Sequence, residues 1–232
     1  MVVGTVVSLA RYPVKSMSGE SLRQFAVTAR GVEADRVWAV YTADGRIGSG
    51  KTTQRFRRID GLVMLGARMD GGRAEIGFPD GTTAAAGSPE ADLRLSDLFG
   101  QPLSVRAETT VPHHDDCPVH LVTTASLRRL EDLLGEPVDT RRARPNLVLD
   151  VGGAGFLDND WKGRDLRIGD EVVLRVGDGM PRCAMVTMAQ PGLAHDARVL
   201  KLIAEHNDLD LGLQTTVLRA GQVRLGDSVR LT

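Results

Sequence analysis

The chain has 232 residues, of which 42% are hydrophobic and 25% are charged, and its formal net charge is −1. This length can form one large or two small domains with a hydrophobic core. The small net charge excludes a general attraction to nucleic acid, and no apolar run approaches the roughly 20 residues needed to span a bilayer. Because Arg11 and Lys15 interrupt the only early apolar stretch, we expect no signal peptide, no membrane partner and a cytoplasmic location.

The predicted elements are mainly short strands. Runs rich in β-branched residues alternate with Gly, Asp and Pro turns, and helical periodicity is scarce. In chain order the predicted strands are residues 2–9, 24–28, 37–41, 62–68, 103–106, 119–123, 147–150, 171–176, 184–188, 215–219 and 228–231. Helices are predicted over residues 124–134, which begin with a capping threonine and stop at Gly135, and over residues 196–205. The expected fold class is mostly β, with a minor α+β character.

Two similar short segments of the sequence bear on the topology. Residues 166–174 and 223–231 each place a Gly-Asp turn between an apolar strand and an alternating strand. Two such hairpins predict a closed or nearly closed β-barrel with the helices packed outside it. A polar, turn-rich stretch between about residues 80 and 118 predicts a boundary. We therefore expect a smaller β unit over residues 1–110 and a larger barrel over residues 111–232, and leave open whether they fold independently.

Residues 45–52 match the P-loop pattern of nucleotide-binding proteins. That loop holds phosphate because a long helix follows it and presents free backbone N–H groups. Here the highly charged residues 54–61 predict no helix, and no alternating βαβ pattern is present. We therefore expect a hairpin turn at residues 43–45 and no NTPase, although Lys51 and its neighbours could still contact an anion.

Three separated segments carry side chains suited to binding or catalysis. They are Lys15 with Ser16, Arg144 with Asn146, and Arg182 with Cys183. A guanidinium beside a cysteine favours the thiolate, which is the form that ligates metals. Taken alone, each polar pair is more often a solvated surface, and the cysteine is more often a buried thiol.

The cysteines and histidines leave alternatives open. Cys117 and Cys183 have no histidine at short spacing, which excludes a zinc site, so each is a buried apolar side chain, a reactive thiol or a ligand of another metal. His113, His114, Asp115 and Asp116 share one polar loop, which is either a solvated turn, a metal site or a source of an acid.

Six short motifs follow one another along nearly the whole chain. They are Tyr-Pro-Val-Lys-Ser at residues 12–16, Gly-x-x-x-Asp-Arg-x-Trp at 31–38, Asp-Cys-Pro at 116–118 with Thr-Thr-Ala-Ser at 123–126, Arg-Ala-Arg-Pro-Asn at 142–146, Pro-Arg-Cys at 181–183 and Val-Arg-Leu-Gly-Asp at 223–227. In this order they resemble the MOSC (molybdenum cofactor sulfurase C-terminal) proteins, which include the amidoxime-reducing components. The resemblance implies an N-terminal MOSC β-barrel-like domain, followed by a MOSC β-barrel with a few peripheral helices.

The resemblance also implies a ligand, the molybdenum cofactor, in which a pterin carries the metal. Cys183 would bind molybdenum through its thiolate, a soft donor, and act in catalysis. The residues implied to hold the pterin and its phosphate are Lys15, Ser16, Arg36, Thr124, Ser126, Arg144, Asn146 and Arg182. Arginine can grip phosphate bidentately, and the free N–H groups at a helix start also favour an anion. Arg182 would either tune the cysteine or neutralise the cofactor.

The implied activity is the reduction of small N-hydroxylated or other N–O substrates. Because the chain has no four-cysteine ferredoxin motif, electrons would come from a separate donor protein of the ferredoxin, flavodoxin or cytochrome type. The reductases carry Thr-Thr-Val-Asp-Pro where this chain has Val-Thr-Met-Ala-Gln at residues 186–190, and Asp where it has Thr124. Both changes remove a candidate proton donor and favour an alternative, a carrier of the cofactor or of sulfur without turnover. A third reading is a degenerate site on a fold that serves as an interaction module.

Overall fold

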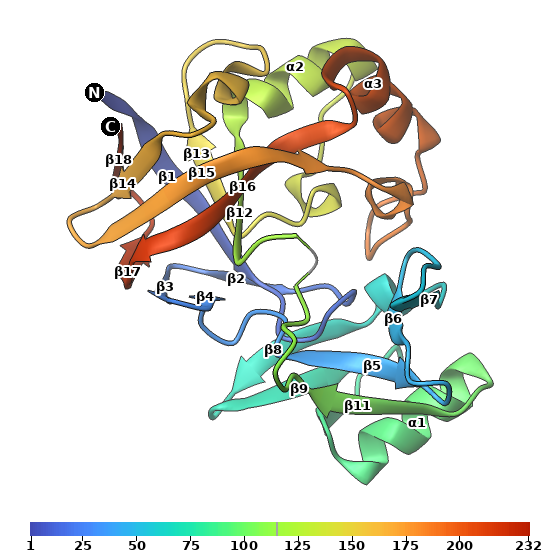
Figure 1. Ribbon diagram of the computed structural model, residues 1–232. Coiled ribbons are helices and arrows are strands. Elements are labelled where there is room, and N and C mark those ends of the chain that lie inside the picture. Colours follow the sequence, from blue (N-terminus) through green and yellow to red (C-terminus); the bar gives the residue numbers. More distant parts are fainter. Residues whose placement is uncertain (115) are drawn as a thin grey trace.

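The computed structural model describes residues 1–114 and 116–232, and its ribbon forms two lobes (Figure 1). The larger lobe is a closed barrel of seven strands in the order β13-β12-β16-β15-β14-β18-β1, which the pairing of β1 with β13 closes. These strands are β1 (Val2–Arg11), β12 (Val119–Thr123), β13 (Leu147–Asp150), β14 (Asp165–Ile168), β15 (Val172–Pro181), β16 (Asp210–Arg219) and β18 (Ser228–Leu231). The short β2 (Glu20–Leu22) extends the sheet beside β1. The predicted mostly β fold with a barrel is confirmed.

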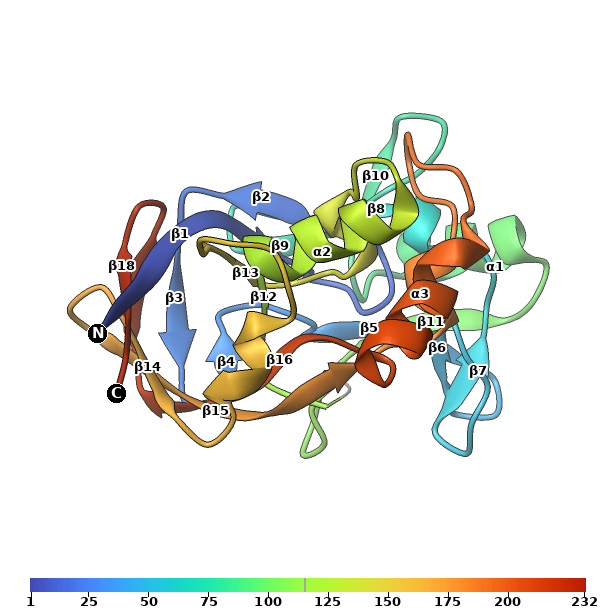
Figure 2. The same cartoon turned by 90° about the horizontal axis from the view of Figure 1, so that it is seen from above.

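Two helices cover the barrel on the side away from the smaller lobe. They are α2 (Thr124–Leu134) and α3 (Ala197–Asn207), and Figure 2 shows α2 over the barrel strands and α3 beyond the end of β16. Every residue of β12 is buried, because the barrel interior covers Leu121 while the helices cover Val122. Helix α2 has its predicted bounds: the Thr123 hydroxyl accepts the Ser126 N–H at its start, and Gly135 ends it at a φ of 78°.

The smaller lobe packs two sheets and one helix around a separate apolar core. Its sheets have the orders β11-β5-β6-β7 and β10-β9-β8. The strands are β5 (Trp38–Thr42), β6 (Ile47–Ser49), β7 (Phe56–Arg58), β8 (Gly66–Asp70), β9 (Arg73–Gly77), β10 (Thr83–Ala85) and β11 (Leu103–Ala107). Helix α1 (Pro89–Phe99) buries Ala91 and Leu95 against them. This helix is absent from the predicted elements, although Ser88 as its cap and Pro89 at its first position are an ordinary start signal.

The two ends of the chain meet at the barrel. The first strand, β1, pairs with β13 and β18, and β17 (Gly221–Arg224) forms a small sheet with β3 (Gln24–Thr28) and β4 (Gly31–Val32). The prediction that residues 223–231 form a hairpin is therefore wrong. Val6 of β1 exchanges backbone hydrogen bonds with Gly226 and Asp227 in the turn, so the chain changes sheets there. The first predicted hairpin, β14 with β15, is confirmed, and the domain boundary near residue 110 stays a prediction.

The segment with the P-loop pattern is a strand and a turn. β5 and β6 pair antiparallel around a turn in which Gly45 has a φ of 78°, and β7, not a long helix, follows. The expected hairpin is confirmed. The strand predicted for residues 62–68 begins instead as a 3-10 helix, η1 (Leu62–Met64), and only its end belongs to β8. Within residues 1–114 and 116–232, no helix is both long enough and apolar enough to cross a membrane.

Candidate functional site

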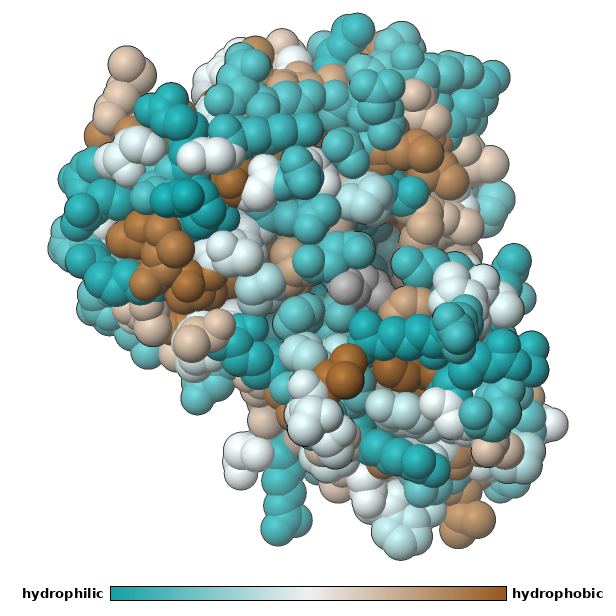
Figure 3. All heavy atoms as spheres, viewed as in Figure 1, coloured by the Kyte–Doolittle hydropathy of each residue, from teal (hydrophilic) through white to brown (hydrophobic). Residues whose placement is uncertain are grey.

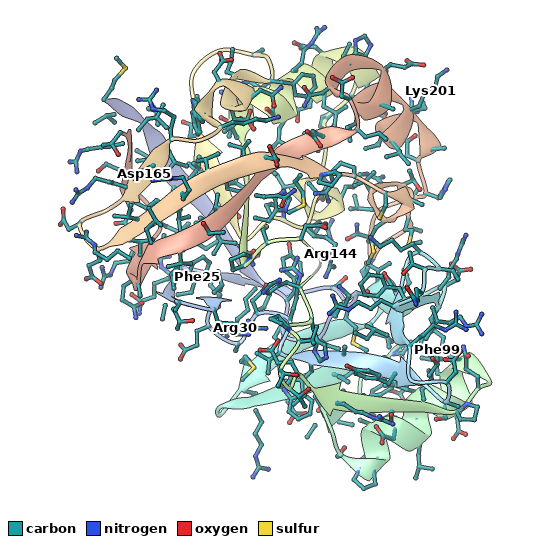
Figure 4. The ribbon with its side chains drawn as sticks, in the orientation of Figure 1. Phe25, Arg30, Phe99, Arg144, Asp165 and Lys201 are labelled. Atoms are coloured by element: carbon teal, nitrogen blue, oxygen red, sulfur yellow. The ribbon has the colours of Figure 1, made fainter. Side chains whose placement is uncertain are left out.

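A cavity of about 240 Å³ opens where the two lobes meet. Figure 3 shows the surface indented there, and Figure 4 places Arg144 between the lobes. The cavity is lined by seven of the nine residues that the MOSC resemblance implies. They are Lys15, Ser16, Arg36, Arg144, Asn146, Arg182 and Cys183. Segments that lie far apart in the sequence therefore present these side chains to one space.

Backbone strain is concentrated at this cavity. Among the described residues, six other than glycine have a clearly positive φ, and three of these line the cavity. Ser16, Arg36 and Arg144 have φ values of 67°, 53° and 52°. This left-handed conformation is unfavourable for residues with a Cβ and persists where surrounding contacts enforce it, often at binding sites. For Ser16 one such contact is the hydrogen bond that its hydroxyl donates to Gly48 O, at 3.2 Å.

Two of the arginines that line the cavity stack on the ring of Tyr12. The guanidinium carbons of Arg36 and Arg144 lie 4.7 and 4.3 Å from the centre of its ring. Its hydroxyl donates to Pro145 O at 3.2 Å, and its backbone N–H donates to Asp35 Oδ1 at 2.8 Å. Stacking on a buried ring fixes the plane of a guanidinium. Tyr12 was part of a predicted motif but not of the predicted site, since this role depends on where the two arginines fold.

His120 lies on strand β12 and contacts three residues that line the cavity. Its Nδ1 lies 3.4 Å from Arg144 O, and its Nε2 lies 3.5 Å from Nη1 of Arg182. Its backbone N–H donates to Asn146 Oδ1 at 3.1 Å, and Asn146 N–H donates back to His120 O at 2.8 Å. Burial, followed by the charges of Arg182 and Arg36, places the pKa of His120 well below 6.5. The ring is therefore neutral at pH 7, and with Nδ1 protonated it accepts a hydrogen bond from Arg182.

Arg182 and Cys183 follow the last residue of β15. The predicted strand over residues 184–188 is wrong: a 3-10 helix, η4 (Ala184–Thr187), begins directly after Cys183 and turns the chain along the cavity. The thiol is partly exposed and lines the cavity. Arg182 donates to Ala143 O at 2.7 Å. Burial lowers the pKa of Arg182 to about 10, so the guanidinium stays charged at neutral pH.

The other cysteine, Cys117, also lines the cavity but differs in chemical state. It is buried, and its Sγ donates to Val119 O at 3.3 Å. Burial raises the pKa of the Cys117 thiol to about 11. It is therefore a protonated thiol at neutral pH, which does not suit a metal ligand.

Two protein-family models together match nearly the whole chain. The model of the MOSC domain matches residues 108–230, and that of the MOSC N-terminal beta barrel domain matches residues 3–114. The chain belongs to the MOSC domain family. It is 25% identical over 283 residues to mitochondrial amidoxime reducing component 2 of Homo sapiens, covering 98% of this chain and 83% of that protein. The protein of the same name from Bos taurus is 24% identical over 288 residues, with the same coverage.

A solved structure shares the fold at low identity. The YUAD protein from Bacillus subtilis superposes with a TM-score of 0.54 over 99% of this MOSC chain and 95% of that chain. Its sequence identity is 10%, so the likeness concerns the fold alone.

Two of the nine predicted residues do not reach the MOSC cavity. Thr124 and Ser126 lie at the start of α2, and their hydroxyls donate hydrogen bonds to carboxylates of the chain. Thr124 donates to Asp150 at 2.8 Å, and Ser126 donates to the buried Asp158. The Ser126 N–H is capped by a hydroxyl of the chain itself. Neither of these two hydroxyls therefore lines the cavity.

Replacing Ser126 with alanine should weaken folding without changing the residues that line the cavity. The buried carboxylate of Asp158 accepts hydrogen bonds from Ser126 and from Thr123, the latter at 2.9 Å. Removing one donor should lower the free energy of unfolding by about 1–3 kcal/mol, measured by urea denaturation. The molybdenum content per chain should stay unchanged. Loss of molybdenum at unchanged stability would restore Ser126 to the cofactor site.

His120 should make the MOSC fold sensitive to acid. Because its folded pKa is lowered, the unfolded chain binds an additional proton below the ordinary histidine pKa of about 6.5. This single group should therefore reduce the free energy of unfolding by about 1.4 kcal/mol for each pH unit below that value. His120→Gln should remove this contribution, giving a flatter profile between pH 7 and pH 5 in urea denaturation. Parallel profiles for variant and wild type would contradict the prediction.

The loop of histidines is a solvated turn only in part: Asp116 is exposed, whereas His113 is buried. His113 is buried, with Nε2 2.9 Å from the Tyr41 hydroxyl and Nδ1 3.1 Å from Val37 O. His114 lines the cavity. In the part of the chain that the structure describes, no group of three or more His, Cys, Asp or Glu side chains could hold a metal ion. Asp115 lies outside the described residues.

Proposed function

We propose that this MOSC protein binds the molybdenum cofactor and reduces small N-hydroxylated substrates, with electrons from a separate donor protein. The observation that carries the proposal is the partly exposed thiol of Cys183 in a cavity to which five cationic side chains contribute. The similarity to proteins named amidoxime reducing component supports the substrate class.

The cavity suits an anionic group with a soft metal. Among its described lining residues, five are permanently cationic and one is a carboxylate, Asp116. The Nε of Arg182 is buried without a hydrogen-bond partner among residues 1–114 and 116–232. A buried, unpaired guanidinium N–H is costly unless an acceptor joins it, and a phosphate or pterin oxygen would be such an acceptor. The thiol supplies the soft donor that molybdenum needs.

The residues that line the cavity would have two roles, to hold the cofactor and to orient it. Arg36 and Arg144, stacked on Tyr12, would hold the phosphate in a fixed plane, and Asn146 and Ser16 would bind polar edges of the pterin. Cys183 would bind molybdenum, with the guanidinium of Arg182 beside it. When bound, the cofactor supplies the two-electron chemistry that removes oxygen from an N–O group.

Protons for the leaving oxygen must come from the protein or from water. His114 and Asp116 line the cavity and are the described side chains best suited to pass a proton from solvent. Burial, with the charges of Arg30 and Arg36, lowers the pKa of His114, so its ring is neutral at pH 7. These two residues would take the place of the acidic group that residues 186–190 lack.

The experiment that tests the function measures molybdenum and turnover on one preparation. Protein expressed in a host that makes the cofactor should hold about one molybdenum per chain and convert benzamidoxime to benzamidine with reduced methyl viologen. Protein without molybdenum after such expression would overturn the proposal.

One specific observation favours a carrier of the cofactor as a second candidate. The segment that follows Cys183, residues 184–190, contributes no carboxylate to the cavity. A carrier would hold stoichiometric molybdenum, release it to an apo-enzyme and reduce no N-hydroxylated compound.

A further inference from the structure

The segment with the P-loop pattern ends at the cavity. Ser49 and Lys51 line it from the smaller lobe, and Cys183 lines it from the barrel. Gly50, which lies between Ser49 and Lys51 in the sequence, is close to two methionines of the barrel lobe. A Cβ at Gly50 would lie 2.9 Å from Met188 Cε and 3.1 Å from Met185 Sδ. Glycine therefore lets this loop pack against the segment that follows Cys183, which keeps Lys51 and the thiol on one cavity.

An aromatic ring holds the ammonium group of Lys51. Its Nζ lies 5.3 Å from the centre of the Phe56 ring, and Lys15 Nζ lies 4.9 Å from the same centre. The Arg55 guanidinium is 5.2 Å away, and its Nη2 donates to Pro112 O. Within residues 1–114 and 116–232, Lys51 forms no ion pair with a carboxylate. A cation held over a ring keeps its remaining N–H donors for a ligand.

Part of the cavity wall on the barrel side, next to Cys183, is apolar and adaptable. Met180, Pro181 and Met185 line the cavity on either side of Cys183. Thioether side chains are flexible and polarisable, so they fit apolar groups of varied shape. The cavity thus combines cationic side chains from both lobes with an apolar patch next to the thiol.

The cationic side chains of the cavity differ in their partners: Arg36 forms an ion pair with Asp35, and Arg182 donates to Ala143 O. The cationic residues that line the cavity are Lys15, Arg36, Lys51, Arg144 and Arg182. Of these cations, Lys51 and Lys15 belong to the group around Phe56, and only Lys51 lies in the loop packed against Met185. Lys51 is therefore the cation best placed to meet a substrate rather than the cofactor.

We propose that Lys51 binds a carboxylate of the substrate, so that the cavity prefers N-oxygenated compounds that combine a carboxylate with an apolar body. The inference rests on the proposed function of the same cavity and names the substrate class. The ammonium would recognise the carboxylate by charge and hydrogen bonding, while the methionine wall accepts the apolar part.

Two substrates that differ by one carboxylate test the proposal. The holoprotein is assayed with benzamidoxime and with 4-carboxybenzamidoxime, and the ratio of their kcat/KM values is compared among variants. Lys51→Met should lower the ratio of carboxylated to uncharged substrate at least tenfold, and Lys51→Arg should restore most of it. Lys201→Met is the matched control: its side chain is 73% exposed on α3, at the edge of the molecule (Figure 4), and the ratio should not change. An unchanged ratio in Lys51→Met would overturn the proposal.

Two further measurements separate this inference from the proposed function. Molybdenum per chain is measured for each variant, and a loss in Lys51→Met would mean that Lys51 holds the cofactor, which overturns the substrate role. Binding of both compounds is measured by calorimetry, which needs no turnover. If the protein reduces neither compound, at least tenfold weaker binding of 4-carboxybenzamidoxime to Lys51→Met would still support the subsite. Equal binding to wild type and variant would overturn it.

Discussion

Replacing Cys183 with serine should abolish molybdenum binding and lower the reduction of benzamidoxime at least about 100-fold. The residue lies at the turn between β15 and η4, where its thiol is partly exposed to the cavity and follows a charged guanidinium. A serine hydroxyl is a hard donor and remains protonated at neutral pH, so it cannot replace a thiolate as a ligand of a soft metal. Elemental analysis of the purified protein and the viologen assay measure the two effects.

The other cysteine provides a matched control. Cys117 lines the same cavity, but it is buried and its thiol donates to Val119 O. A serine hydroxyl can donate the same hydrogen bond, so Cys117→Ser should keep molybdenum within about twofold of wild type. Retention of molybdenum in both variants would show that Cys183 is not the ligand. Loss in both would mean that the shape of the cavity, and not a thiolate, determines binding.

The barrel was predictable where the signals are local. Strands β12 and β13 and helix α2 have the bounds that the sequence predicts, because each combines a continuous pattern with a clear start or stop such as Gly135. The predictions were wrong where the structure of a segment depends on a partner that is distant in the sequence. Strand β17 pairs with β3, nearly 200 residues earlier, and the apolar run after Cys183 forms a 3-10 helix instead of the predicted strand.

In the candidate site, too, the residues that lie in local motifs were predictable, and those that depend on the fold were not. Motifs placed seven residues at the cavity, whereas Tyr12 and His120 act through contacts that exist only after folding, a ring between two guanidinium groups and an imidazole between two arginines. The prediction for Ser126 assumed that a helix start is open to an anion. In the structure Thr123 caps that start, which is a local signal, and Asp158 accepts the Ser126 hydroxyl from 32 residues later, which the local sequence does not show.

The largest expected loss of stability comes from replacing Gly212 with alanine. Gly212 lies in β16 with a φ of 81°, and a Cβ there would lie 2.3 Å from Leu121 O and 2.8 Å from Nε2 of His120. Gly135 has nearly the same φ, 78°, but nothing lies within 4 Å of a Cβ built there. Both variants incur the cost of a left-handed alanine, about 1 kcal/mol. Only Gly212→Ala must also push β16 away from β12.

We therefore expect Gly212→Ala to lose about 3–5 kcal/mol of unfolding free energy in urea, against about 1 kcal/mol for Gly135→Ala. Equal losses would mean that the barrel relaxes around the new methyl group without cost. The strain should also reach the cavity, because β12 carries His120 between Arg144 and Arg182. Folded Gly212→Ala protein should consequently hold less molybdenum than folded Gly135→Ala protein. That difference would tie the close contact between two barrel strands to the geometry of the cofactor site.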